Sequence, residues 1–220
     1  FEDGQERKRK MFHGDACAGH GKLRPASPRT AVPYEVLDSV SSTIRSYPQG
    51  FVPHPKLDKL LEKRVETLKD GKGIEWGFAE GLAFGTLALD GVHVRLSGQD
   101  CCRGTFSQRH LVLDHYEGGK PYSPLTTLDA PGSFEVYNSP LSEVGVMGFE
   151  FGYAAESTGS LVLWEGQFGD FANGAQVIID QFLSSSEAKW QQLSGLVLLL
   201  PHAYEGQGPE HSSARLERFL

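Results

Sequence analysis

Residues 161–182 read LVLWEGQFGDFANGAQVIIDQF, and this stretch decides the fold. The first eight residues are mostly apolar, which is typical of a buried β-strand. The residues that follow predict a helix over residues 170–190. One face of that helix would carry Phe171, Ala175, Ile178, Ile179 and Phe182. A buried strand that runs into an amphipathic helix is one unit of a parallel α/β sheet.

The same alternation extends along the chain on both sides of this stretch. Further strands are predicted over residues 92–98, 133–138 and 195–202, and helices over residues 76–89 and from near Ser139 to residue 155. Apolar strands between helices predict an α/β fold whose parallel sheet is covered by helices on both faces. Upstream, helical patterns occupy residues 34–45 and the residues after Pro55, where Leu57, Leu60, Leu61, Val65 and Leu68 share one face.

Three regions of the sequence differ in composition and in hydrophobic periodicity. Residues 1–30 are polar, contain glycine and proline, and end in a linker-like KLRPASPRT. Residues 31–72 are predicted to form a helical connecting segment. Residues 73–220 carry the alternating pattern and are predicted to form the α/β domain.

Composition narrows the class of protein. The 220 residues carry a net charge of -7, which disfavours a general nucleic-acid binder. Since no apolar stretch approaches the ~20 residues needed to cross a bilayer, and no signal peptide is recognisable, we expect no membrane partner. Three cysteines, two of them adjacent, suggest a reducing cytosolic setting. The chain begins with Phe1, so we expect a fragment.

Polar and aromatic residues follow the predicted strands, in the loops of residues 97–110, 138–143, 165–174 and 201–213. Ligands of parallel α/β sheets bind outside the carboxyl ends of the strands, so these loops are the predicted site. Glu143 would lie in the first turn of a helix capped by Ser139 and begun by Pro140. There it either complements the helix dipole or acts in the site.

Several residues of these loops allow both a structural and a functional interpretation. Phe168 and Phe171 are either core aromatics or a flat face on which a cofactor ring stacks. His211, near the start of a last helical pattern, is either a cap or a group that donates a proton or holds an anionic substrate. His202 follows a proline and could bond only to loop backbone.

Metal binding is weakly indicated. Cys101, Cys102, His110 and His115 match no usual zinc spacing. The string HGDACAGHG, residues 13–21, is a weak signal for a phosphate or metal loop.

Long ordered strings in these loops resemble a known family. They are RLSGQDCCRGTFSQRH, SPLSEVGVMGFEFGYA, LWEGQFGDFANGAQVIIDQFLSSSEAKW and EGQGPEHSSARLERFL. From about Arg29 to its end, the chain resembles the decarboxylating, thiamine-diphosphate-dependent first component of the 2-oxoglutarate dehydrogenase complex. The resemblance implies a transketolase-like architecture in which residues 73–220 are the pyrimidine-binding domain and residues 1–30 include a remnant of the diphosphate-binding domain.

The resemblance also implies roles for individual residues. Glu143 would hydrogen-bond a pyrimidine nitrogen and so favour the imino tautomer that generates the ylide. Phe171 would pack against the pyrimidine, and Gln99 and Leu141 would line the cofactor pocket. His211 would face the substrate, and Asp15 in HGDA would bind magnesium.

The implied activity is that of 2-oxoglutarate dehydrogenase (succinyl-transferring), an oxidoreductase of the tricarboxylic acid cycle. Thiamine diphosphate and Mg²⁺ would serve to decarboxylate 2-oxoglutarate. The succinyl group would pass to the lipoyl domain of dihydrolipoyl succinyltransferase. The resemblance further implies a homodimer that completes the active site, located in the cytoplasm, or in the mitochondrial matrix of a eukaryote.

The sequence departs from the family after residue 21. KLRPASPRT follows HGDACAGHG directly, so most of the diphosphate-binding domain, with the asparagine that would join Asp15 on magnesium, is missing. The sequence is therefore expected to be a fragment or an internally deleted product that carries the pyrimidine half of the site. Two alternatives remain: a catalytically silent dimerisation fragment, and a relative specific for 2-oxoadipate, whose extra methylene is worth only ~1–3 kcal/mol of discrimination.

Overall fold

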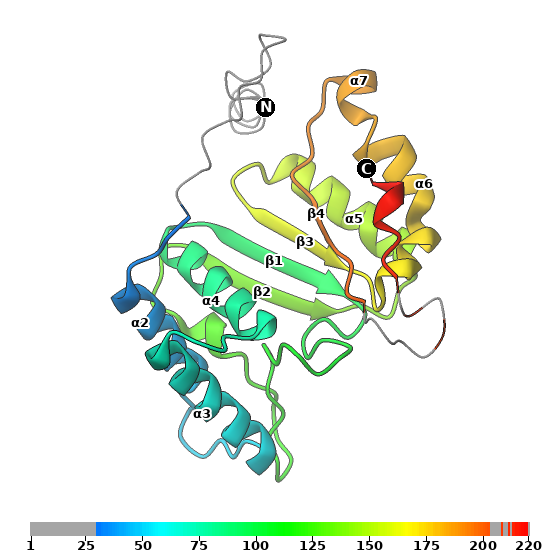
Figure 1. Cartoon of the computed structure of the whole chain (residues 1–220). Coiled ribbons are helices and arrows are strands. Elements are labelled where there is room, and N and C mark those ends of the chain that lie inside the picture. The colour runs from blue at the N-terminus through cyan, green and yellow to red at the C-terminus, as the bar shows by residue number, and fades with distance from the viewer. Residues whose placement is uncertain (1–29, 203–207, 209–210, 212, 220) are drawn as a thin grey trace.

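A single four-stranded parallel sheet forms the centre of the molecule (Figure 1). The computed structural model describes residues 30–202, 208, 211 and 213–219. The strands are β1 (His93–Gly98), β2 (Ser133–Asn138), β3 (Leu161–Glu165) and β4 (Val197–Leu199), in the spatial order β2-β1-β3-β4. The predicted α/β fold with a parallel sheet is confirmed.

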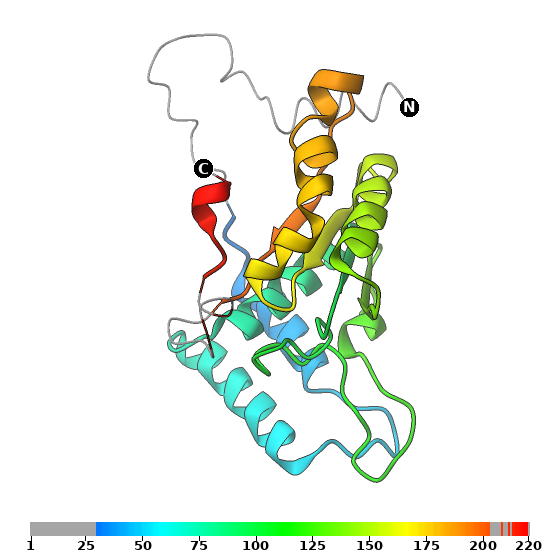
Figure 2. The same ribbon diagram turned by 90° about the vertical axis from the view of Figure 1, so that its right-hand side faces the viewer.

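Helices cover the two faces of the sheet, as Figures 1 and 2 show. α4 (Trp76–Leu89) lies on one face and α5 (Glu143–Glu156) on the other. Alternate residues of each strand therefore enter different cores: Val94, Leu96 and Leu163 pack with α4, whereas Val162 and Trp164 pack with α5.

The helices of the predicted connecting segment belong to the same core as α4. α2 (Tyr34–Ile44) buries Val40, and α3 (Pro55–Asp70) buries Leu61. The packing of α2 on α4 is close at Gly85, where an added Cβ would lie 2.4 Å from Cγ1 of Val40. Residues 31–72 are thus an integral part of the packed structure on the α4 side.

Local signals explain the bounds of α3. Nδ1 of His54 accepts a hydrogen bond from the Lys56 amide at 3.1 Å, and Pro55 occupies the first helical position. Gly71 ends the helix in the left-handed conformation, at φ 65°.

Short 3-10 turns also occur in the described chain, at η2 (Pro124–Thr127) and η6 (Leu216–Arg218). Where the sequence predicts a helix near His211, the described residues show His211 itself in 3-10 conformation and the turn η6.

The continuous helix predicted over residues 170–190 is wrong. The chain forms instead the 3-10 helix η3 (Gly169–Ala175), a short α6 (Gln176–Ile178), the π-helix η4 (Ile179–Leu183) and α7 (Ser186–Trp190). The backbone of η3 packs closely at both ends: an added Cβ would lie 2.9 Å from the Leu200 carbonyl at Gly169, and 3.0 Å from a Glu143 oxygen at Gly174. These tertiary contacts favour the tighter 3-10 turn over regular helical geometry.

The last two strands are shorter than predicted. β3 ends at Glu165 rather than at residue 168, and β4 has three residues. β4 is also not the fully buried strand that its apolar sequence predicts, because it lies at the edge of the sheet and Val197 is 37% exposed. Within the described chain, no helix is both long enough and apolar enough to cross a bilayer.

Candidate functional site at the carboxyl edge of the sheet

The carboxyl ends of the four strands lie in register at one edge of the sheet. Gly98 is level with Asn138 on one side and Glu165 on the other, and Glu165 is level with Leu199. The loops that follow these residues therefore leave the sheet side by side. This is the edge at which a parallel α/β sheet binds its ligands.

The start of α5 differs from the sequence prediction. The Ser139 amide donates to the Gly98 carbonyl at 2.8 Å, so this residue continues the pairing beyond β2 and does not cap a helix. The helix begins at Glu143, with Ser142 in the N-cap position and no side-chain cap. The predicted cap at Ser139 is therefore wrong, and Glu143 is the first helical residue, at the positive end of the helix dipole.

The Glu143 carboxylate contacts η3. An ideal Cβ on Gly174 would lie 3.0 Å from Oε2 of Glu143, so a side chain at position 174 would press on the carboxylate. Glycine thus allows the backbone of η3 to approach this acid. η3 also carries Phe171. The contact therefore places the Glu143 carboxylate beside the short helix to which Phe171 belongs.

Four rings cluster where η3 meets the C-terminal segment. The ring centroids of Phe168 and His211 are 4.0 Å apart, and those of Phe171 and His211 are 5.9 Å apart. Phe106, from the loop after β1, meets Phe168 edge-on at 5.6 Å. Phe168, which the sequence offers as an alternative stacking residue, lies closer to the histidine than Phe171 does.

Backbone contacts bring the C-terminal segment to this position. The Gly169 amide donates to the Pro201 carbonyl at 2.7 Å, and Arg215 forms an ion pair with the buried Asp170. His202 lines a cavity together with Phe106, and its Nδ1 is 3.1 Å from the Leu200 carbonyl oxygen. That contact agrees with the backbone-bonding alternative for His202.

Gln99 and Leu141 meet on the other side of the edge. Nε2 of Gln99 donates to the Leu141 carbonyl at 3.3 Å, which joins the loop after β1 to the loop after β2. The Leu141 side chain is 62% exposed. The structure therefore forms two adjoining groups, Gln99 with Leu141 and Glu143 with the ring cluster of η3. The roles given to these residues stay predictions.

The sequence prediction did not include a buried ion pair beneath the site. Arg109 forms a bidentate pair with Glu165 at the end of β3, and its Nε donates to Glu80 at 3.0 Å. Its Nη1 also donates to the Cys101 carbonyl at 2.9 Å. Burial alone would lower the pKa of Arg109, but Glu165 and then Glu80 raise it above its usual value. Conversely, burial raises the pKa of Glu165 although Arg109 opposes this.

This ion pair fastens the loop of residues 99–110 to the sheet. The sequence carries one signal for this ion pair. Glu165 is an acid in an otherwise apolar strand, and a buried acid needs a cationic partner.

The two adjacent cysteines are free thiols. The interaction between them raises the pKa of Cys101, which is also buried, and lowers the pKa of Cys102. Among the residues that the structure describes, no three His, Cys, Asp or Glu side chains are grouped to hold a metal ion. Asp15, the expected magnesium ligand, lies outside the described residues.

Comparison with known proteins gives consistent matches. A protein family described as "Transketolase, pyrimidine binding domain" matches residues 72–220. The chain is 54% identical over 200 residues to 2-oxoglutarate dehydrogenase, mitochondrial, from Saccharomyces cerevisiae. The matched residues make up 90% of this chain and 20% of that protein. The chain is 53% identical over 192 residues to the 2-oxoglutarate dehydrogenase E1 component of Bacillus subtilis, a match that covers 87% of this chain and 20% of that protein. The corresponding Rickettsia felis protein is 51% identical over 210 residues, with 95% and 22% covered. The chain thus spans about a fifth of the length of these curated relatives.

Proposed function

Since the chain belongs to the transketolase pyrimidine-binding domain family, we propose that it supplies the half of a thiamine diphosphate site that holds the aminopyrimidine ring. The parent activity is the decarboxylation of 2-oxoglutarate by a 2-oxoglutarate dehydrogenase, with succinyl transfer to the lipoyl domain of dihydrolipoyl succinyltransferase. Identities of 51–54% to such enzymes support this assignment. We propose a location in the cytoplasm, or in the mitochondrial matrix of a eukaryote, since the yeast relative is named as mitochondrial.

One observation carries the proposal: Glu143 lies against η3, the turn that also brings Phe171 to His211. A carboxylate beside a cluster of aromatic faces fits a planar ring with basic nitrogens. Glu143 would hydrogen-bond a nitrogen of that ring, and Phe171 would pack against its face. Gln99 and Leu141 would line the pocket at its edge.

Thiamine diphosphate, when bound, supplies a nucleophilic carbon and an electron sink for decarboxylation of a 2-oxo acid. The residues of this chain hold and orient the ring. His211, whose ring lies against those of Phe168 and Phe171, would face the substrate and donate or accept a proton. Asp15 would be one magnesium ligand on the diphosphate side of the site. The other ligands would come from outside this sequence.

A homodimer is part of the proposal. On the exposed side of α5 and in the loop before it, Leu141, Val144 and Phe149 are 62%, 38% and 61% exposed. We therefore expect this face of α5, with the exposed Gly145 and Gly152 beside it, to contact a second copy. Small residues would allow the two backbones to approach closely.

A transplant tests the catalytic assignment. The matched segment of yeast 2-oxoglutarate dehydrogenase is replaced by this chain, and 2-oxoglutarate-dependent decarboxylation is measured. We expect an active hybrid that loses at least about 100-fold of its rate on Glu143→Gln, since an aligned acid or base contributes roughly 10²–10⁴-fold. Glu156→Gln, an exposed change at the other end of α5, is the control and should keep the rate.

The second candidate function is a catalytically silent dimerisation fragment. It is favoured by the exposed face of α5. A hybrid that folds and assembles but does not decarboxylate would favour this candidate. An active hybrid in which Glu143→Gln keeps its rate would contradict the role of Glu143.

A further inference from the structure

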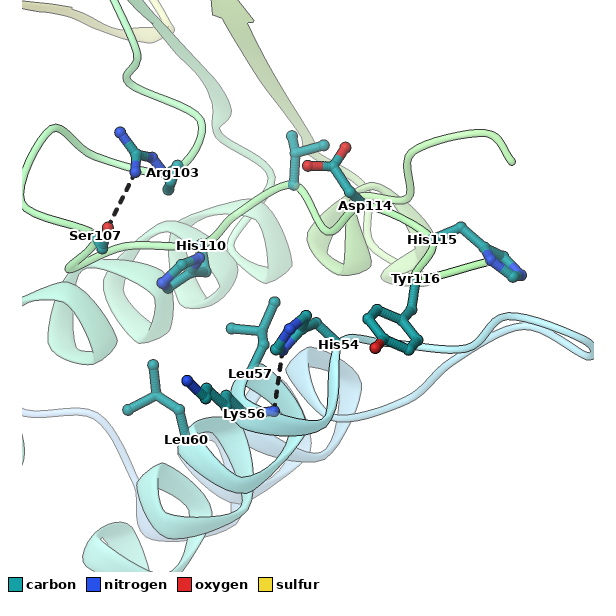
Figure 3. A pocket seen from close by; sticks show the side chains of 11 residues that line it. His54, Lys56, Leu57, Leu60, Arg103, Ser107, His110, Asp114, His115 and Tyr116 are labelled. Atoms are coloured by element: carbon teal, nitrogen blue, oxygen red, sulfur yellow. Dashed lines mark hydrogen bonds between the residues drawn. The ribbon is translucent and has the colours of Figure 1, made fainter. Parts of the chain in front are cut away.

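A cavity of about 650 Å³ lies outside the candidate site, between the N-terminus of α3 and residues 103–116 (Figure 3). Its lining includes none of the residues assigned to the ring site. The volume lies within the range of roughly 300–1,000 Å³ that is usual for small-molecule sites. The cavity therefore requires its own explanation.

The lining has an apolar floor and a basic rim. Leu57, Leu60 and Val112 are half-buried and form the apolar part. Lys56 and Arg103 supply cations from α3 and from the opposite loop, as Figure 3 shows. Arg103 forms an ion pair with Asp100, whereas Lys56 forms no ion pair within the described chain.

His110 reports a positive potential inside this cavity. Burial lowers the pKa of His110, and the nearby cations Arg64 and Arg103 lower it further, while a hydrogen bond with the Ser107 backbone and the charge of Glu75 oppose them. The lining contains one acid, Asp114, whose carboxylate points away from Lys56 and His110 in Figure 3. A positive cavity in a chain of net charge -7 concentrates small anions.

The wall of the cavity is held in an uncommon backbone conformation. Ser107 and His110, both in the lining, have φ values of 54° and 59°, in the left-handed region. The buried Arg64 holds this wall by donating to the Gln108 carbonyl at 2.5 Å and to the Arg109 carbonyl at 3.0 Å. Residues kept in such conformations by surrounding structure concentrate at functional sites.

We propose that this cavity binds a small amphipathic organic anion, with a phosphate or carboxylate head and an apolar body. The head lies between Lys56, Arg103 and His110. The body lies on the leucines of α3 and on Val112. This inference is independent of the thiamine assignment, because no residue is shared between the two sites.

Phenyl phosphate serves as the probe, with the full chain at neutral pH. Binding is followed by calorimetry and by the NMR signal of the His110 ring, which is identified as the signal lost in His110→Asn. Phenyl phosphate should bind at least ten-fold more tightly than phenol or inorganic phosphate and should shift the His110 signal. Lys56→Gln should weaken binding about five- to ten-fold.

Lys59→Gln is the matched control, since Lys59 is an exposed lysine of the same helix that does not line the cavity. It should bind the probe like the unmodified chain. Equal weakening by the two lysine changes would overturn the proposal. So would an unchanged His110 signal, or phenyl phosphate affinity no greater than that of its two parts.

Discussion

Arg109 shows how a single residue can join three parts of the chain. Its guanidinium bonds to Glu165 of β3, to Glu80 of α4 and to the Cys101 carbonyl, and Arg109 and Glu165 are almost fully buried. Removing one partner of a buried pair leaves the other charge without compensation. We therefore expect Arg109→Met to lower the free energy of unfolding by about 3–5 kcal/mol, measured by urea denaturation.

Two further variants separate this effect from a general loss of packing. Arg109→Met combined with Glu165→Leu should recover a large part of the loss, since both buried charges are then removed. Arg103→Met breaks an ion pair whose arginine is 51% exposed, so it should change stability by less than about 1 kcal/mol. A single Arg109→Met change no larger than the Arg103→Met change would contradict the importance of the buried pair.

At the scale of elements, glycines decide how closely α4 approaches its neighbours. A Cβ at Gly77 would lie 1.8 Å from the Gln108 carbonyl oxygen, whereas a Cβ at Gly81 would meet the ends of the Ile44 and Leu111 side chains at 3.4 and 3.8 Å. Gly77→Ala should therefore destabilise the protein by about 1–3 kcal/mol through overpacking. Gly81→Ala should be neutral or stabilise it by up to about 1 kcal/mol, since alanine favours a helix.

Thermal unfolding of the two variants provides the comparison. Both positions lie in α4, so a difference between them reports the approach of the Gln108 backbone rather than helix propensity. Similar melting temperatures for the two variants would show that the loop of residues 99–110 yields to an added methyl group. The loop would then be less firmly held than its hydrogen bonds to Arg64 imply.

At the scale of the whole molecule, the exposed face of α5 is the proposed contact with a second copy. Val144 is 38% exposed, so Val144→Glu should leave the folded monomer intact. In a dimer the same change would bury a carboxylate without a partner, and we expect the dissociation constant to rise at least about ten-fold, or 1.4 kcal/mol. Sedimentation velocity over a range of protein concentrations measures this shift.

The matched control is Val52→Glu, in the loop between α2 and α3. Val52 is 37% exposed and lies beside helices that pack on α4, on the face of the sheet opposite α5. The change should leave the sedimentation behaviour unaltered. If both glutamate variants sediment like the unmodified chain, α5 is not the contact between copies, and the exposed face needs another partner.

The sequence by itself determined the order and type of most elements. β2 and α4 match their predicted ranges, and the parallel sheet follows from apolar strands that alternate with helices. Such strands are read easily because burial on both faces requires apolar residues at successive positions. The loops that carry Gln99, Glu143, Phe171 and His211 were likewise found from the sequence, since they follow strand ends.

Tertiary structure decided what depends on contacts between distant residues. The start of α5 at Glu143 follows from the bond between Ser139 and Gly98, and the broken helix at η3 follows from its close packing on Glu143 and Leu200. The pairing of Arg109 with Glu165 and the cavity beside α3 also join separate segments. Local patterns cannot specify these features, because hydrogen bonding and close packing are set by whichever backbone the fold brings alongside.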